Sequence, residues 1–314
     1  MRIPLIAWIG LVLLIGASLS LGAASLWQGD LEAGWLIAVS RFPRTAAALL
    51  AGAGLALAGV VAQLSVQNRL VEPSLTGTPE AATLGLLAIT LVAPGAALIW
   101  KMVASAITAL IGTAGFLALA RHVPRHDPIL LPIVGLVYGG ILGAIAIGAA
   151  WITDLLQYLG AWRMGEFSGV VQGRYELLWG IAILAVLLYV LADRITLLAL
   201  GERQARSLGL NYAQTRMIGL AIVSCITALV VVTVGALPFV GLVAPNIVSR
   251  LYGDDLRANL PAIALLGAGA VLAADVLGRL IRYPYEIPAG TVFAVVGAGV
   301  FLWLLHRPGR HANG

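Results

Sequence analysis

Few residues in this chain have the type and position to do chemistry inside an apolar environment. Asp275 is the clear carboxylate candidate within an apolar stretch, and Arg279 follows it four residues later. A carboxylate in a membrane span can act as a proton or sodium site. Residues four apart share one helical face, however, and opposite charges at that spacing attract. An intrahelical ion pair between Asp275 and Arg279 is therefore the favoured interpretation.

Metal, nucleophile and nucleotide chemistry are poorly supported. His122 and His126 are four apart, but Pro124 separates them in a short basic stretch, and Cys225 has no partner at metal-site spacing. Nothing in the sequence suggests a metal site, a resident cofactor or a catalytic residue, so we do not expect an enzyme. The single lysine, Lys101, is not part of a phosphate-binding loop. Any ATP and magnesium would therefore be bound by a partner.

Composition defines the setting of these residues. The chain has 314 residues, 61% of them hydrophobic, with 19 basic and 14 acidic residues. Soluble proteins are about 45–50% apolar and about 25% charged. These values exclude an ordinary soluble domain and indicate one all-α integral membrane domain over residues 1–314. The basic residues are dispersed between apolar stretches, so the net charge of +5 does not indicate nucleic-acid binding.

Apolar stretches of about 20 residues predict ten membrane-spanning helices. The eighth is short and is the least secure as a full crossing. The predicted spans are Pro4–Ala24, Phe42–Val66, Leu75–Ala93, Ala96–Ala120, Ile129–Ile152, Leu177–Leu191, Met217–Leu237, Phe239–Leu251, Ala262–Leu280 and Ile287–Leu305.

The distribution of basic residues predicts the orientation. With a cytoplasmic N-terminus, twelve basic residues face the cytoplasm and seven face the outside, in agreement with the positive-inside rule. The outer seven oppose the usual bias and so invite another explanation. They are Arg41, Arg44, Lys101, Arg163, Arg174, Arg279 and Arg282.

Small residues at helical spacing predict close helix packing. Gly135, Gly139 and Gly143 are four apart in the fifth span, with Gly140 and Gly148 nearby. Such spacing lets helix backbones approach closely in lipid.

The longest polar stretch that faces the cytoplasm covers residues 193–216. Within it, Gly201, Glu202, Ala205, Leu208 and the helix-stopping Gly209 indicate a short amphipathic helix on the membrane face. Composition alone leaves two interpretations open, a docking element for another protein or an ordinary connecting loop.

At this point the sequence resembles the FecCD, or BtuC-like, family of ABC import permeases for iron-siderophore, haem and vitamin B12 complexes. The polar stretch is similar to the family's coupling segment, and the other similarities follow in order from about residue 41 to 305. They are Arg41-Phe42-Pro43-Arg44, Gly52, Gly59, Gln63, the signature Phe239, Gly241, Leu242, Pro245 and Asn246, then Gly253-Asp254-Asp255, Leu260-Pro261, Gly267-Ala268, Asp275 with Arg279, and Glu286-Ile287-Pro288 with Gly290.

Two positions depart from the family pattern. Asn246 stands where histidine is more usual, and Arg69 replaces a second proline. Together with Arg282-Tyr283-Pro284-Tyr285-Glu286, these departures resemble the branch that serves catecholate-type ferric siderophores.

The resemblance implies a type II importer permease in the bacterial inner membrane. Its partners would be a second permease subunit, either identical or different, two ATPase subunits, and a periplasmic or lipoprotein substrate-binding protein. Arg41, Arg44 and Arg279 would dock the binding protein through its acidic residues. Gly201, Glu202, Ala205, Leu208 and Gly209 would couple to the ATPase. The fifth and tenth spans are the expected walls of the path.

Alternatives remain at this stage. Within the family the cargo could be haem or vitamin B12, because a binding protein does most of the selection. Outside it, an ion-coupled secondary transporter or exporter would be expected to carry several intramembrane carboxylates. A channel or structural membrane protein would lack the docking helix.

Overall fold

The structure is a computed structural model that describes residues 4–22, 32–73, 77–120, 122–123, 130–283 and 285–306. Within these ranges the regular secondary structure is entirely helical, as predicted, and contains no strand. Five of the twelve basic residues predicted to face the cytoplasm lie outside the described residues, as does Pro284 of the branch motif; the five are Arg2, Arg121, Arg125, Arg307 and Arg310.

Ten longer helices match the ten predicted spans in order. Three short helices lie between them: α2 (Glu32–Leu36), α7 (Leu156–Arg163) and α9 (Glu202–Ser207). The longer helices are α1 (Leu5–Ser20), α3 (Phe42–Val66), α4 (Thr78–Val92), α5 (Leu98–Ala120), α6 (Leu130–Ile152), α8 (Trp179–Thr196), α10 (Tyr212–Val234), α11 (Val240–Tyr252), α12 (Leu256–Ile281) and α13 (Ala289–His306).

Not all ten helices are long enough to cross a membrane alone. Six helical segments of the described chain reach the length and apolarity of a full span, and α1, α4 and α13 are shorter apolar helices. The eighth predicted span is α11, which has only 13 residues and contains Pro245. At 1.5 Å per residue it extends about 20 Å, which is less than a hydrocarbon core of about 30 Å. The length of α11 thus answers the question that the sequence left open, whether the eighth predicted span crosses fully: the helix alone is too short.

A π-helical turn, Ile37–Arg41, joins α2 to α3. Its cause is local, because Pro43 has no N–H with which to bond the carbonyl of Val39. That carbonyl instead accepts a hydrogen bond from the backbone N–H of Gln172, at 2.9 Å. The turn sets the direction in which Arg41 and Arg44 leave the helix.

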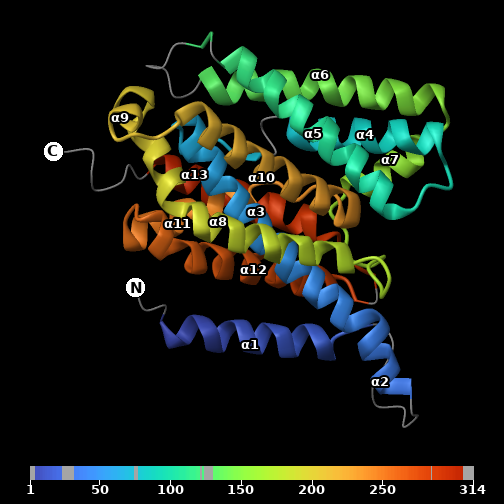
Figure 1. The fold of residues 1–314 in the computed structure, drawn as a ribbon. Coiled ribbons are helices and arrows are strands. Elements are labelled where there is room, and N and C mark those ends of the chain that lie inside the picture. Colours follow the sequence, from blue (N-terminus) through green and yellow to red (C-terminus); the bar gives the residue numbers. More distant parts are fainter. Residues whose placement is uncertain are drawn as a thin grey trace.

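Helix α3 is the central element, and α8, α10, α11 and α12 pack around it (Figure 1). Helices α4, α5, α6 and α7 form a second group that joins the first through α10, and α1 lies against α12. Helix α9 lies at one end of the bundle, and α2 at the other (Figure 1). We call these the α9 end and the arginine end, because Arg41, Arg44 and Arg279 lie at the latter.

Glycines allow two very close backbone crossings on α3. A Cβ atom on Gly52 would lie 2.3 Å from the carbonyl oxygen of Gly267 in α12. One on Gly59 would lie 1.8 Å from the carbonyl oxygen of Gly241 in α11. No side chain fits at such distances, so these glycines set the spacing of the three helices.

The glycines predicted to pack closely, those of α6, do not do so throughout. A Cβ on Gly140 or Gly148 would meet no other atom within 4 Å. Gly139 and Gly143 face neighbours at ordinary contact distances. The prediction of tight packing was therefore wrong for part of α6, because helical spacing alone does not show which glycine faces a neighbour.

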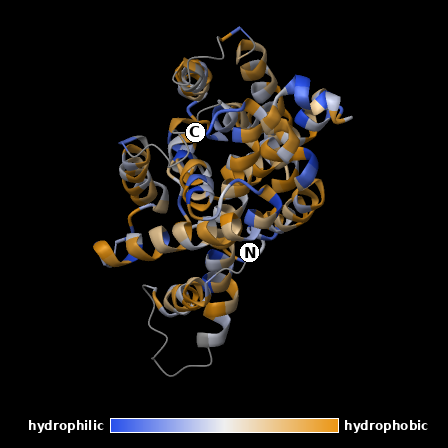
Figure 2. Cartoon of the chain, turned by 90° about the vertical axis from the view of Figure 1, so that its left-hand side faces the viewer, coloured by the Kyte–Doolittle hydropathy of each residue, from blue (hydrophilic) through white to orange (hydrophobic). Residues whose placement is uncertain are grey.

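The surface of the bundle suits lipid. Viewed from the α9 end, most helix ribbons carry the colour of apolar residues (Figure 2). Large apolar side chains are exposed along α6 and α8, among them Leu136, Ile145, Ile183 and Val190. Contiguous exposed apolar surface of this kind does not occur on ordinary soluble monomers.

The crossing of α3 and α11 gives a test of the fold. We expect Gly59→Ala to destabilise the protein by about 1–3 kcal/mol, because the added methyl must push two backbones apart. Thermal unfolding in detergent measures this. The matched control is Gly148→Ala, which faces open space and should be neutral or stabilising. Equal melting temperatures for the two variants would contradict the proposed role of Gly59.

Candidate functional site

At the arginine end, the carboxylate of Asp275 in α12 is the centre of an ion-pair cluster. Arg44 of α3 donates to Asp275 Oδ1 through Nη2 at 2.8 Å, and Arg279 pairs with Oδ2. Arg44 also donates through Nη1 to Glu286 at 2.8 Å. The predicted Asp275–Arg279 pair is confirmed, and the structure adds Arg44, which is 231 residues away in the sequence.

Two arginines at the arginine end form hydrogen bonds with the last turn of α1. Arg279 Nη1 donates to the carbonyl oxygens of Ser18 and Leu21, and its Nη2 donates to Ser18 Oγ. Arg41 Nη1 donates to the carbonyl oxygens of Leu19 and Ser20 at 2.9 and 2.8 Å. The last carbonyls of a helix lack intrahelical partners and carry partial negative charge, so two guanidinium groups satisfy them well.

This arrangement places the three predicted docking residues mostly inside the chain. Arg41 and Arg279 are each 6% exposed, and the side chain of Arg44 is 14% exposed. Of the three, Arg44 reaches furthest towards the surface. The docking role of the three residues stays a prediction.

Arg282 is an exposed cation of this region that the docking prediction left out. It lies directly after α12, with its guanidinium 5.7 Å from the ring centre of Tyr285. The sequence signal for it was present, since it belongs to the outer seven basic residues and adjoins the Tyr283–Tyr285 aromatics.

At the α9 end, the predicted coupling segment contains the six-residue helix α9 between two left-handed glycines. Gly201 has a φ of +85° and Gly209 a φ of +81°, a region that favours glycine. Ala205 is fully buried, whereas Leu208 is 62% exposed. Glu202 pairs with Arg206 on the exposed side. The segment therefore presents Leu208 outwards and fixes Ala205 inwards.

Gln67, at the end of α3, holds this segment in place. Its Nε2 donates to the carbonyl oxygen of Ala199 at 3.2 Å, two residues before Gly201. A Cβ on Gly201 would lie 3.1 Å from the same nitrogen. The sequence analysis missed Gln67, because a lone glutamine carries no pattern that points to a contact 132 residues away.

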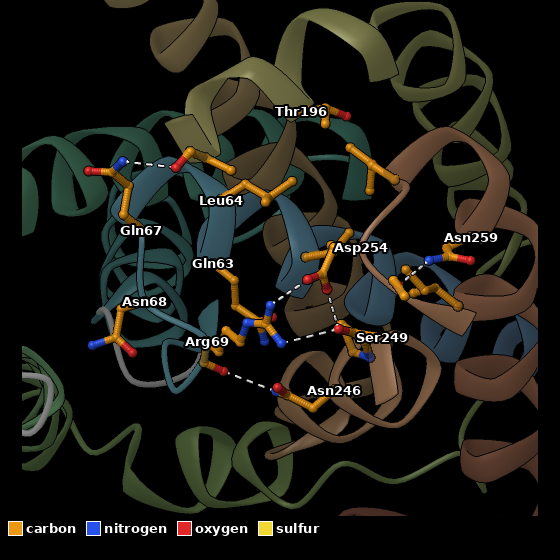
Figure 3. A pocket seen from close by; sticks show the side chains of 16 residues that line it. Gln63, Leu64, Gln67, Asn68, Arg69, Thr196, Asn246, Ser249, Asp254 and Asn259 are labelled. Atoms are coloured by element: carbon orange, nitrogen blue, oxygen red, sulfur yellow. Dashed lines mark hydrogen bonds and ion pairs between the residues drawn. The ribbon is translucent and has the colours of Figure 1, made fainter. Parts of the chain in front are cut away.

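A pocket of about 270 Å³ with polar and apolar lining residues lies beside this anchor, between the ends of α3, α8, α11 and α12. Figure 3 shows Gln63, Gln67, Arg69, Asn246, Ser249 and Asp254 around it. The two departures from the family pattern meet here, since Asn246 Nδ2 donates to the carbonyl oxygen of Arg69 at 3.0 Å. The side chain of Arg69 pairs with Asp254 at 2.6 Å.

The remaining signature residues serve mainly as structure. Phe239 begins α11 with a φ of +67° and stacks on Phe301, and Leu242 is fully buried. The carbonyl of Pro288 accepts from the first turn of α13. Gly290 donates its N–H to the carbonyl oxygen of Gly165 at 2.9 Å.

The two predicted wall helices do meet at one cavity. A cavity of about 500 Å³ is lined by Gly143 and Ala146 of α6, by Gly290 and Ala294 of α13, and by parts of α4, α7 and α10. These helices are the fifth and tenth predicted spans. This cavity is therefore the candidate for part of a transport path that the wall prediction identifies.

Comparison with known proteins agrees with this geometry. The model of the FecCD transport family matches residues 4–307. The chain is 39% identical to a petrobactin import permease, FatD of Bacillus anthracis, over 97% of this chain and 91% of that protein. It is 40% identical to a ferric-anguibactin permease of Vibrio anguillarum, over 87% and 88%. It is 38% identical to the vitamin B12 permease BtuC of Escherichia coli, over 96% and 94%.

A solved structure is similar over almost the whole fold. It is described as an inward-facing conformation of a metal-chelate type ABC transporter, and it superposes with a TM-score of 0.82 at 26% identity. The match covers 96% of this chain and 98% of that one. The fold and the site thus define a membrane-spanning permease of the ABC importer class. The chain belongs to the FecCD transport family.

The buried cluster predicts an unequal effect of two similar substitutions. Asp275→Asn leaves two guanidinium groups without their shared carboxylate, and we expect it to destabilise the protein by about 3–5 kcal/mol. Asp254→Asn breaks the exposed pair with Arg69 and should cost less than about 1 kcal/mol. Thermal unfolding of the two variants in detergent compares them. Similar melting temperatures would show that the Asp275 cluster does not stabilise the arginine end.

Proposed function

We propose that this chain is the permease subunit of an ABC importer that moves a ferric siderophore across the membrane. The observation that carries the proposal is the near full-length similarity to permeases for petrobactin and ferric anguibactin, at 39–41% identity. The similarity to a metal-chelate type transporter at a TM-score of 0.82 supports the same class of cargo.

A catecholate-type siderophore is the cargo that the branch motif favours. The support is the pair of departures at Arg69 and Asn246, whose main-chain and side-chain atoms bond to one another. Vitamin B12 is the second candidate, because the chain is 38% identical to a vitamin B12 permease over 96% of its length.

The energy for transport would come from two partner ATPase subunits that bind ATP and magnesium. These subunits would dock at the α9 end, which would therefore face the cytoplasm together with the N-terminus. The support is the exposed side chain of Leu208, directly after α9, in a segment whose start is hydrogen-bonded to Gln67. An exposed apolar side chain on a rigid helix suits insertion into a groove of another protein.

A substrate-binding protein would dock at the opposite, arginine end. Arg44 and Arg282 would supply the positive charge for acidic residues of that protein, which steers association. Arg41 and Arg279 would act indirectly, because they hold the end of α1 beneath that surface. A second permease subunit would complete the path along the cavity between α6 and α13.

The proposed cargo is tested with the assembled transporter in liposomes. We expect ATP-dependent uptake of ferric petrobactin when the binding protein is present, and no uptake when a proton gradient replaces ATP. Radioactive iron inside the vesicles measures this. Uptake of cobalamin but not of ferric petrobactin would instead favour the vitamin B12 alternative. Uptake by the isolated permease on an ion gradient would contradict the ABC mechanism.

The coupling proposal is tested at Leu208. Because this side chain is 62% exposed, Leu208→Asp should leave the fold intact and reduce recovery of the ATPase with the permease about tenfold or more. Copurification of the ATPase measures this. The matched control is Tyr283→Asp, an equally exposed apolar-to-acid change at the arginine end. Full ATPase recovery with Leu208→Asp would exclude α9 as the docking element.

A further inference from the structure

The cavity between α6 and α13 contains two opposite charges. Its lining is otherwise uncharged, and the two exceptions are Glu80 from the first turn of α4 and Arg163 from the end of α7. They come from different helices and reach the same space. Whatever passes through this space would meet one carboxylate and one guanidinium group.

One carboxylate oxygen of Glu80, Oε2, is buried and lacks a hydrogen-bond partner among the described residues. Glu80 also forms no ion pair with any cation in the described part of the chain. Burying a charged oxygen without a partner is costly, so a folded protein rarely keeps one without a use.

Arg163 is similarly unpaired. It is exposed, and the described residues supply no carboxylate within ion-pair distance. This sets it apart from Arg279, which is buried and pairs with Asp275.

Gly143 of α6 shows how near the two groups lie. A Cβ atom on Gly143 would be 3.6 Å from Arg163 Nη2 and 3.6 Å from Glu80 Cγ. A Cβ on Gly139, one turn earlier, would be 3.5 Å from Glu80 Oε2. The glycine face of α6 therefore leaves room beside both charges, and the two face one gap without closing it.

Helix dipoles explain why Glu80 is acidic and Arg163 is basic. They do not explain why an oxygen of Glu80 is buried or why both charges face one cavity. A glutamate in the first turn and an arginine in the last turn of a helix are each favourable by about 0.3–1 kcal/mol. That benefit is available to a side chain that stays in water. It gives no reason for the buried oxygen of Glu80 or for the convergence of the two charges on one cavity.

We infer that Glu80 and Arg163 form a two-point binding site for a zwitterionic metal chelate on its way through the permease. Glu80 receives a protonated amine of the chelate, and Arg163 receives a carboxylate or another acidic oxygen. This inference rests on the proposed function, and it adds a charge requirement for the cargo that the permease itself imposes. Each contact is a charge-assisted hydrogen bond in a cavity with few competing partners.

The charges are tested with a reporter cysteine in the assembled transporter. Cys225 is the single cysteine of the chain, so Cys225→Ser provides a clean background, and Thr291→Cys places a thiol on the α13 side of the cavity. The measured quantity is the ratio of its reaction rates with a cationic and an anionic methanethiosulfonate reagent. We expect Glu80→Gln to lower this ratio about fivefold and Arg163→Gln to raise it.

Two further variants make the labelling result decisive. Glu80→Asp keeps the charge and should keep the ratio, and Glu166→Gln removes an exposed carboxylate beyond the cavity lining and should leave the ratio unchanged. An unchanged ratio in Glu80→Gln would overturn the inference, because the carboxylate would then carry no charge that the cavity experiences.

The ligand class is tested by protection of the same thiol. The probe is 6-aminohexanoate, which carries one ammonium and one carboxylate, and its partner is the N-acetyl derivative, which lacks the ammonium. We expect the zwitterion to slow labelling by neutral N-ethylmaleimide at least about threefold more than the acetylated probe, and Glu80→Gln to abolish the difference. Equal protection by the two probes would overturn the proposed ammonium contact.

The result is distinguishable from a failure of the proposed function. If the transporter takes up no ferric siderophore but the zwitterion protects the thiol in a Glu80-dependent way, the charge site stands and the cargo proposal fails. If ferric siderophore uptake is ATP-dependent and Glu80→Gln alters neither uptake nor labelling, the function stands and the charge site fails.

Discussion

A single buried carboxylate organises one end of this protein. Asp275 is 2% exposed and pairs with Arg44 from α3 and Arg279 from its own helix. Charges are kept in so apolar a setting only when they are paired and hydrogen-bonded, so the three groups depend on one another. Since Arg279 also binds the end of α1, the carboxylate links α1, α3 and α12. The surface proposed for binding-protein docking lies over this link.

The second constraint is backbone proximity along α3. Gly52 and Gly59 bring α12 and α11 so close that carbonyl oxygens occupy the space a side chain would need. Gln63, one turn after Gly59, donates to the carbonyl oxygen of Gly241 at 3.2 Å. The family motifs of α3 and those of α11 and α12 are separate in the sequence, but in the fold they contact one another. These contacts fix the spacing of α3, α11 and α12.

The two ends of the bundle differ in how they use charge. At the arginine end Arg44 and Arg279 pair with Asp275, and Arg41 binds the end of α1, whereas Arg174 and Arg282 are exposed. At the α9 end the ion pairs of Arg69 and Arg206 are exposed, and such pairs contribute little stability. The rigid element there is held instead by hydrogen bonds from Gln67. Between the ends, Glu80 and Arg163 line the cavity between α6 and α13, where we propose that they bind the cargo.

The sequence by itself determined the membrane class, the order of the ten longer helices and the Asp275–Arg279 pair, because apolar length and i,i+4 spacing are local properties. The motifs, in their order along the chain, also indicated the FecCD family. Only the tertiary structure decided that Arg44 completes the pair, that Arg41 and Arg279 are buried, and which glycines meet. These outcomes depend on contacts between residues far apart in the chain, and helical periodicity does not specify which helix a given face will meet.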